Sequence, residues 1–165
     1  MPEVHVAVSG GGDAGEEACR LAEQVGLELA RRGAVVVTGG LGGAMAAACR
    51  GAKEGGGTTI GILPGNDRAA ANEWVDGAVP TGLGEGRNAL VVRAADAVIA
   101  VAGEFGTLSE IALALKLGRP VVGLGTWELA RDGRPVAAIV DATTAAEAAE
   151  TAIRLARRRA PRTGS

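Results

Sequence analysis

Aromatic side chains are scarce in this sequence, which contains one Phe, two Trp and no Tyr among its 165 residues. The core must therefore be built from Val, Ile, Leu and Ala, and with 47% hydrophobic residues the chain is long enough for one sizeable globular core. Metal ligands are scarce as well: Cys19 and Cys49 fall in helical patterns and His5 in an apolar strand, without the spacing of a metal site. We therefore expect buried, reduced thiols and no metal ion.

Long apolar runs and basic blocks are also missing. No hydrophobic run reaches the roughly 18 residues of a membrane span, so we expect no membrane association. Met1-Pro2-Glu3 leads directly into an apolar segment without the charged start of a secretory signal, which predicts a cytoplasmic protein. The net charge is −2 and no basic block precedes the C-terminal tail, so nucleic acid is not an expected partner.

Short apolar segments alternate with amphipathic ones along the chain. The pattern predicts strands over residues 4–8, 34–37, 58–63, 97–102, 120–124 and 137–140, and a further short strand within 74–79. It predicts helices over residues 16–32, 44–54, 86–95 and 107–117, and a last helix that begins after Thr143 or Thr144. Because several strands are apolar throughout, we predict one doubly wound, Rossmann-like α/β domain with a mainly parallel sheet over residues 1–160, followed by a tail over residues 161–165.

Glycine is abundant, with 27 residues that cluster where predicted strands end. In a doubly wound sheet, ligands bind outside the carboxyl ends of the strands, near the point where the strand order reverses. Ser9-Gly10-Gly11-Gly12 is the first such cluster, and we expect Ser9 and Gly10 to contact a ligand. NAD or FAD is not the expected ligand, because a strict G-x-G-x-x-G is absent and Thr38-Gly39 stands where an acidic residue is required. A Walker A motif is absent too.

Four glycines in Thr38-Gly39-Gly40-Leu41-Gly42-Gly43 separate a buried strand from a helix. Backbone N–H groups in such a turn can wrap an anion, and the dipole of the following helix adds to the attraction. The alternative is a tight strand-to-helix turn in which glycine only permits close packing. We favour an anion cradle formed by Gly39, Gly40, Gly42 and Gly43.

A second glycine turn follows the apolar segment 97–102 and opens the helix 107–117. Gly103, Gly106 and Thr107 are expected to place unpaired N–H groups above the strand end, where they suit a phosphate. Glu110 adds a carboxylate at the lip of the same hollow, in reach of a bound ligand. The alternative for Glu110 is a glutamate that only complements the helix N-terminus.

Arg87 and Asn88 begin a predicted helix in Gly84-Glu85-Gly86-Arg87-Asn88. A cation there opposes the helix dipole, but the glycines leave Arg87 room to point into a hollow and to bind a phosphate or carboxylate with two hydrogen bonds. The alternative is a solvated arginine that pairs with Glu85 or Asp96.

Residues 38–43, 81–88 and 103–110 together resemble the Rossmann-like nucleotide-binding proteins once described as lysine decarboxylases, a group that includes the cytokinin-activating LOG enzymes. The sequence is most similar to the bacterial branch related to the molybdenum cofactor carrier protein of algae. LOG enzymes hydrolyse the N-glycosidic bond of nucleoside 5′-monophosphates and release ribose 5-phosphate. The resemblance implies that Arg87 and Glu110 match their catalytic pair and Gly106-Thr107 their phosphate turn. The sequence departs at Ala102, where those enzymes have proline, and at Glu104, where they have glycine.

The expected function is binding of a phosphorylated small molecule, either a nucleotide or a molybdenum cofactor-like pterin, by a carrier or sensor that requires no cofactor of its own. The alternative is a LOG-like phosphoribohydrolase with Arg87 and Glu110 as catalytic residues. Glu104 favours the carrier or sensor, because a carboxylate in the phosphate turn repels a 5′-phosphate by about 4 kcal/mol per unit charge at ~4 Å and an effective dielectric constant near 20. The resemblance also implies a homodimer or higher homo-oligomer, and the small residues of the helices from Ala44 and Leu108 would allow close approach of helices.

Overall fold

The computed structural model describes residues 2–159, and the predicted tail over residues 161–165 lies outside them. The strands of its main sheet are β1 (His5–Ser9), β2 (Val35–Thr38), β3 (Thr59–Leu63), β4 (Gly77–Pro80), β5 (Ala97–Val101), β6 (Val121–Leu124) and β9 (Ile139–Asp141). The helices are α1 (Glu16–Arg31), α2 (Ala44–Glu54), α3 (Arg87–Arg93), α4 (Phe105–Lys116) and α5 (Ala145–Arg159). Thr144 caps α5, because its hydroxyl accepts a hydrogen bond from the N–H of Glu147.

The seven-stranded sheet has the order β4-β3-β2-β1-β5-β6-β9, and all of its strand pairs are parallel. The chain moves outward from β1 to β4, returns to place β5 beside β1, and then moves outward in the other direction. This is the doubly wound, Rossmann-like arrangement predicted from the sequence, and the strand order reverses between β1 and β5.

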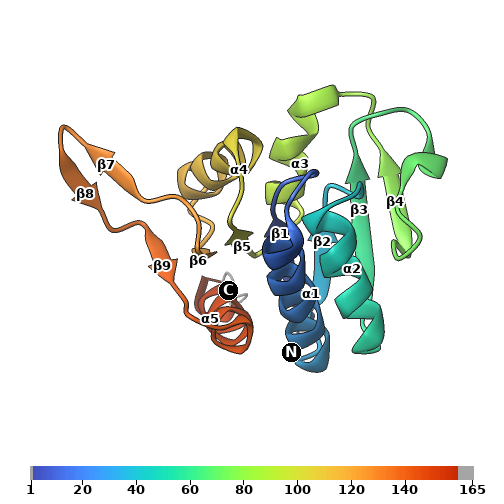
Figure 1. Ribbon diagram of the computed structural model, residues 1–165, viewed down its shortest axis with the longest axis horizontal. Helices are drawn as coiled ribbons and strands as arrows, with labels where there is room; N and C mark the ends of the chain where they lie inside the picture. Colours follow the sequence, from blue (N-terminus) through green and yellow to red (C-terminus); the bar gives the residue numbers. More distant parts are fainter. Residues whose placement is uncertain (1, 160–165) are drawn as a thin grey trace, which may run out of the picture.

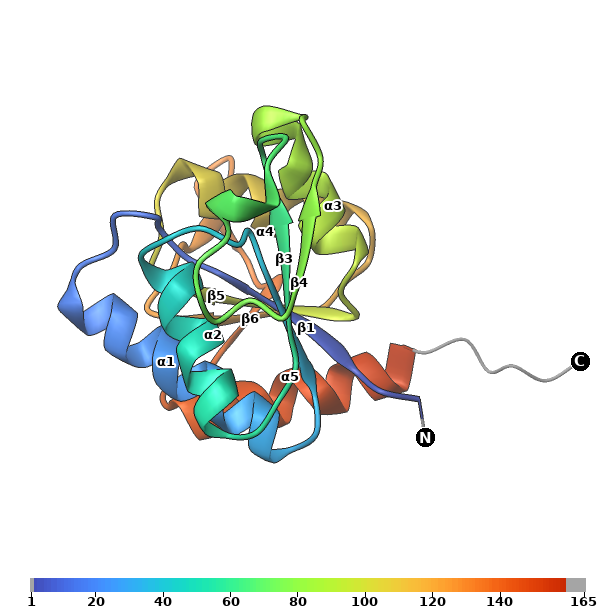
Figure 2. The same ribbon diagram turned by 90° about the vertical axis from the view of Figure 1, so that its right-hand side faces the viewer.

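Helices cover both faces of the sheet (Figures 1 and 2). The helices α1, α2 and α5 pack on one face and α3 and α4 on the other. The apolar strands supply both cores, since side chains alternate along a strand: Val8 and Ile99 point to the first layer, and Ala7 and Val98 to the second. All five residues of β5 are buried, which explains its continuous apolar sequence.

The helices α1 and α2 approach each other closely through two glycines. A Cβ atom at Gly26 of α1 would collide with the carbonyl of Ala48, and one at Gly51 of α2 with the carbonyl of Glu23. The small residues of α2 are therefore buried against α1 of the same chain. Our expectation that they serve contact between copies is wrong for this face of α2, while the homo-oligomer itself stays a prediction.

A two-stranded hairpin, β7 (Leu129–Arg131) and β8 (Arg134–Val136), projects from the body of the molecule (Figure 1). The sequence analysis missed it, although its turn is Asp132-Gly133, one of the strongest short-range hairpin signals. Both turn residues have positive φ, +52° and +72°, as a primed turn requires.

Other boundaries differ by a few residues. The strand expected within 74–79 begins at Gly77, and the helix expected over 86–95 is shorter because Gly84–Gly86 form a 3₁₀ turn before it. Within residues 2–159, no helix combines the length and the apolar character needed to cross a membrane.

Replacement of Gly51 by Ala should destabilise the fold. The gain in helix propensity is about 1 kcal/mol, but the new methyl group collides with backbone of α1, and overpacking of this kind costs about 1–3 kcal/mol or more. We expect a net loss of about 1–2 kcal/mol in the free energy of unfolding, measured by urea denaturation. Gly65→Ala is the matched control, since no heavy atom lies within 4 Å of its added Cβ. A Gly51→Ala protein as stable as the control would contradict the close helix contact.

Candidate functional site

A cleft of about 230 Å³ opens at the carboxyl ends of β1 and β5, where the strand order reverses. Loops and helix N-termini from four places in the sequence form its walls. They are the end of β1 and its following loop (Val8, Ser9, Gly10, Gly11, Gly12, Asp13), the turn after β2 and the start of α2 (Gly39, Met45), the start of α3 (Arg87, Asn88) and the start of α4 (Glu104, Gly106, Thr107, Glu110). The predicted residues Ser9, Gly10, Gly39, Arg87, Asn88, Gly106, Thr107 and Glu110 thus come together in space.

Glu110 is the buried carboxylate of the cleft. Only 8% of the residue is exposed, and the hydroxyl of Ser9 at the end of β1 donates a hydrogen bond to its Oε2. Burial raises the pKa of Glu110 to about 7, although the charge of Arg87 opposes the increase. Glu110 can therefore hold or release a proton near neutral pH, which a solvated glutamate at a helix N-terminus does not do.

Arg87 is partly buried on the other side of the cleft. Its guanidinium donates hydrogen bonds to Oδ1 of Asn88 and, over 3.4 Å, to the carbonyl of Gly39, while its Nε is buried without an acceptor. Burial lowers the pKa of Arg87, and the charge of Glu110 acts in the opposite direction. No ion pair within 4.0 Å joins Arg87 to Glu85, Asp96 or Glu110 in the part of the chain that the structure describes. Arg87 therefore belongs to the cleft and is not a surface arginine paired with a neighbouring acid.

Gly39 is the residue that admits the Arg87 side chain. A Cβ atom at position 39 would lie 2.6 Å from a guanidinium nitrogen of Arg87 and 2.7 Å from the sulfur of Met45. Real Cβ atoms do not approach other atoms so closely, so any larger residue at position 39 must displace Arg87, Met45 or both.

The first turn of α4 borders the cleft with backbone donors. The N–H groups of Gly106 and Thr107 lie in this first turn and have no acceptor within the helix. Gly103 has a φ of +98° and packs directly against Thr107, so it shapes the turn without lining the cleft. Glu104 lies exposed at the rim, where a carboxylate can reach a bound ligand.

Ala102 stands where the LOG enzymes have proline, and the loop after β5 requires a residue other than proline here. Ala102 has a φ of +46°, and the ring of proline cannot adopt a positive φ. Its N–H also donates to the carbonyl of Leu124 over 3.0 Å, a hydrogen bond that proline cannot make. The loop after β5 therefore follows a path that a proline at this position would not allow.

Of the four glycines in the turn after β2, Gly39 lines the cleft, whereas Gly40, Gly42 and Gly43 lie outside its lining. Gly40 packs on Leu63, and a Cβ atom at Gly43 would collide with the carbonyls of Gly11 and Gly12. The N–H of Ala44, which begins α2, donates to the carbonyl of Gly11 over 3.0 Å. The α2 N-terminus is thus capped by the β1–α1 loop, and Gly40 and Gly43 permit close packing of this turn.

The sequence analysis missed Asp13 and Met45 as wall residues. Asp13 directly follows the glycines of the loop after β1, and this position close to a strand end was the only signal in the sequence. Met45 gave no signal, because a methionine in a helix is ordinarily a core residue.

Comparison with known proteins supports the expected family. A sequence model described as the SLOG cluster4 family matches residues 3–157. An uncharacterized protein from Archaeoglobus fulgidus is 42% identical over 124 residues, which cover 75% of this chain and 82% of that protein.

Solved structures with the same fold include two proteins of similar length. The molybdenum cofactor binding protein from the phototrophic bacterium Rippkaea orientalis is 34% identical, with a TM-score of 0.80 over 96% of this chain and 98% of that chain. The Moco carrier protein from Chlamydomonas reinhardtii is 35% identical, with a TM-score of 0.83 over 95% of this chain and 99% of that chain.

The raised pKa of Glu110 predicts a pH-dependent stability. A carboxylic acid whose pKa is higher in the folded state stabilises the fold fully below its unfolded pKa, near 4.5, and this contribution is lost as the pH rises through about 7. Relative to Glu110→Gln, the wild type should lose on the order of 3 kcal/mol of unfolding free energy over this interval. Chemical denaturation at several pH values measures it, with the exposed Glu73→Gln as the control for loss of one carboxylate. If the difference in unfolding free energy between the wild type and Glu110→Gln did not change with pH, the burial of an ionisable Glu110 would be contradicted.

Proposed function

The chain belongs to the SLOG cluster4 family, and we propose that its cleft binds a phosphorylated pterin of the molybdenum cofactor type, which the protein carries and does not convert. The observation that supports this proposal best is the buried Nε of Arg87, a charged donor that has no protein acceptor and lies beside the cleft. A buried donor of this kind is costly unless a ligand supplies the acceptor. The names of the related structures from Rippkaea orientalis and Chlamydomonas reinhardtii give the pterin class.

The donors of the cleft fit a phosphate. Arg87 can offer more than one N–H to the same group, and the N–H groups of Gly106 and Thr107 stand at the positive end of the α4 dipole. Ser9 and Asn88 add neutral polar groups to the same walls. We assign the phosphate to this place and expect Gly10 to approach it with its backbone.

An adjoining groove offers room for the rest of such a ligand. It has a volume of about 680 Å³ and shares Arg87, Asn88 and Gly106 with the cleft. Apolar side chains contribute much of its wall, including Leu41, Pro64, Leu113 and the ring of Phe105, which is 74% exposed. A fused planar ring suits this surface, because an aromatic face adds stacking to the burial of apolar area.

Glu104 favours carriage over hydrolysis of a nucleotide. Its exposed carboxylate lies at the rim, near the first turn of α4, and repels the 5′-phosphate of a nucleotide bound there. A cargo that also carries a positive group near Glu104 is repelled less.

A LOG-like phosphoribohydrolase is the second candidate, favoured by Glu110. A carboxyl group with a pKa of about 7, within the field of Arg87, has the protonation behaviour of a general acid or base. In that reading Glu110 exchanges a proton at the glycosidic bond, and Arg87 binds the charge of the substrate.

Replacement of Gly39 by Ala should weaken cargo binding with little effect on stability. The added methyl group displaces the ends of two flexible side chains, so the fold can adjust but Arg87 leaves its position. Removal of the guanidinium in Arg87→Ala should cost about 1.5–3 kcal/mol, or roughly 10- to 150-fold in affinity. The probe is molybdenum cofactor released from a purified molybdoenzyme, and the bound fraction is measured by molybdenum content and mass spectrometry.

Gly42→Ala is the matched control for Gly39→Ala. Its Cβ would meet only the carbonyl of Gly12, at an ordinary 3.8 Å, and Gly42 lies outside the cleft lining. The control should bind like the wild type. Equal affinity of wild type, Gly39→Ala and Arg87→Ala would overturn the assignment of the cleft.

Adenine release from AMP separates carrier from hydrolase. We expect little or no turnover by the wild type, and a gain of activity in Glu104→Gly if the rim carboxylate is what prevents phosphate binding. A general acid or base contributes about 10²- to 10⁴-fold to a rate, so Glu110→Gln should remove any activity that Glu104→Gly gains. Robust wild-type turnover that Glu110→Gln abolishes would establish the hydrolase instead.

A further inference from the structure

A second concave surface lies at the opposite edge of the sheet from the cleft. It is a groove of about 510 Å³ between the end of α1 and the C-terminal half of α5. We call it the arginine groove and define it by its lining: Arg32, Glu150, Ile153, Arg154, Arg157 and Arg158. A smaller hollow next to it includes residues that directly precede β1 and β2, which places the groove at the amino ends of the strands.

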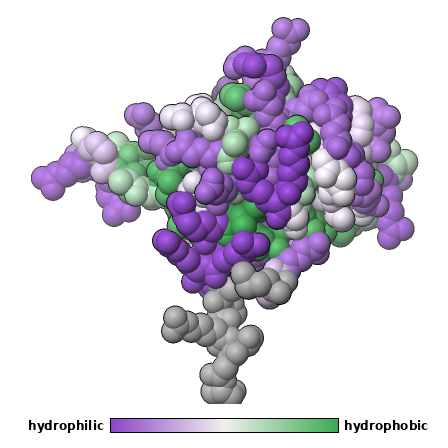
Figure 3. Space-filling view, turned by 90° about the horizontal axis from the view of Figure 1, so that it is seen from below, coloured by the Kyte–Doolittle hydropathy of each residue, from purple (hydrophilic) through white to green (hydrophobic). Residues whose placement is uncertain are grey.

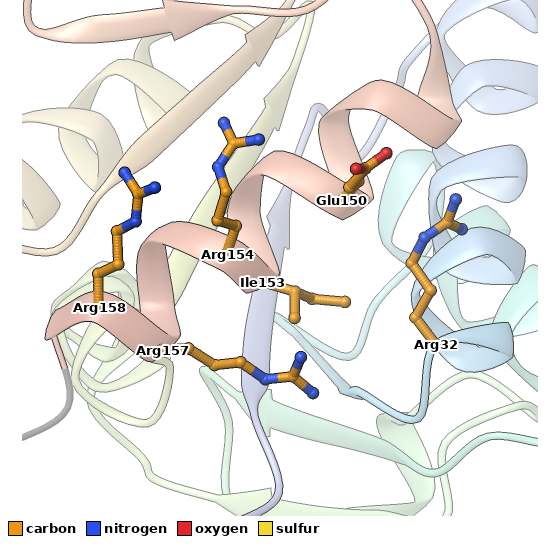
Figure 4. Close-up of a pocket in the computed structure, with 6 residues that line it drawn as sticks. All are labelled: Arg32, Glu150, Ile153, Arg154, Arg157 and Arg158. Carbon is orange, nitrogen blue, oxygen red and sulfur yellow. The ribbon is translucent and has the colours of Figure 1, made fainter.

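The side chains of the groove form a charged border around an apolar centre (Figure 4). Ile153 and Arg157 extend from α5 toward Arg32, while Arg154 and Arg158 extend together from another flank of the helix. Arg154 and Arg158 are four residues apart and therefore lie one above the other on α5, while Arg157 extends from the flank that carries Ile153. Figure 3, which views the molecule from below, shows hydrophobic surface open between hydrophilic side chains on this side.

The positive charge of the groove is largely uncompensated within the chain. Arg32 forms an ion pair with Glu28, but over residues 2–159 no carboxylate lies within 4.0 Å of the guanidinium groups of Arg154, Arg157 or Arg158. Residues 150–159 contain four Arg and one Glu, a net charge of +3, so the other 155 residues carry −5 of the total of −2. This segregation produces a local positive field on a protein that is acidic elsewhere.

Helix stabilisation explains only part of this arrangement. Cations in the last turn of α5 complement the negative end of its dipole, which accounts for Arg157 and Arg158. It does not account for Arg154, which lies further from the helix end, whereas Arg32 ends α1 and pairs there with Glu28. Arg32 at the end of α1 and the three arginines of α5 all line the groove, although they come from different positions on two helices.

The surroundings of the groove select among anionic partners. A compact phosphate is disfavoured because the α5 C-terminus presents carbonyl groups and no free N–H groups. Nucleic acid is disfavoured because Phe105, Trp74 and Trp127 all lie away from the groove, which therefore has no aromatic platform for a base, and because the rest of the chain is acidic. A protein segment with alternating carboxylates and apolar side chains satisfies both the guanidinium border and the apolar centre.

We infer that the arginine groove docks an acidic, partly apolar segment of another protein, with its carboxylates at Arg154, Arg157 and Arg158 and an apolar side chain over Ile153. Because the groove and the cleft lie at opposite edges of the sheet, the docked partner leaves the cleft open. Docking at the groove is therefore independent of what the cleft binds and of whether the proposed cargo is correct.

The test uses a fluorescein-labelled peptide of alternating Glu and Leu residues and measures its fluorescence anisotropy with the full chain. We expect saturable binding that weakens as salt is added, and at least a tenfold loss of affinity in Arg154→Gln/Arg157→Gln. The double variant Arg131→Gln/Arg134→Gln, which removes two charges from the β7–β8 hairpin, is the matched control and should bind like the wild type. Circular dichroism of both variants checks that α5 and the hairpin remain folded.

Three results would overturn the inference. The first is absence of peptide binding by the wild type, and the second is equal loss of affinity in both double variants, which would mean an unspecific charge effect. The third is equal or tighter binding of a Gln-Leu peptide, a single-stranded oligonucleotide or inorganic polyphosphate at the same groove, which would assign another partner. Cargo binding in the cleft should be unchanged in Arg154→Gln/Arg157→Gln, so a failure of the proposed cargo does not affect this result.

Discussion

The reversal of strand order between β1 and β5 is the constraint on which the site depends. The chain leaves β1 toward α1 on one face of the sheet and leaves β5 toward α4 on the other face. Two adjacent strand ends therefore have no helix or loop that crosses directly above them. The opening exposes the ends of both strands, and the residues proposed to contact the phosphate stand on its border.

The opening brings a buried carboxyl group and a partly buried guanidinium group into one small space. Ser9, at the end of β1, holds the Glu110 carboxylate that α4 supplies, while Arg87 reaches the cleft from α3. Removal from water destabilises the charged form of both groups, and their mutual attraction offsets only part of that cost. An anionic ligand of the kind proposed above would satisfy the guanidinium and leave Glu110 protonated.

The two edges of the sheet have different electrostatic character. At the carboxyl ends, helix N-termini and one arginine border a cleft of about 230 Å³. At the amino ends, exposed arginines of α5 surround an open groove of about 510 Å³. Small molecules need enclosure and precisely placed donors, whereas protein segments need an extended surface, so the two edges suit different classes of partner.

The sequence by itself determined the fold class, most of the helices and strands, and the chemical nature of the site, because these depend on local periodicity and on glycines at strand ends. It also marked Arg87 and Glu110 as candidates with the alternatives left open, since a cation between glycines and a carboxylate after a glycine turn are local signals. Only the tertiary structure decided which glycines border the cleft: Gly39 lines it and admits Arg87, whereas Gly40 and Gly43 pack on neighbouring segments. That distinction could not be predicted, because all of them stand in one turn and differ only in what distant segments place against them. For the same reason, the contact of Ser9 with Glu110, 101 residues apart, follows from strand order and register, which no local pattern encodes.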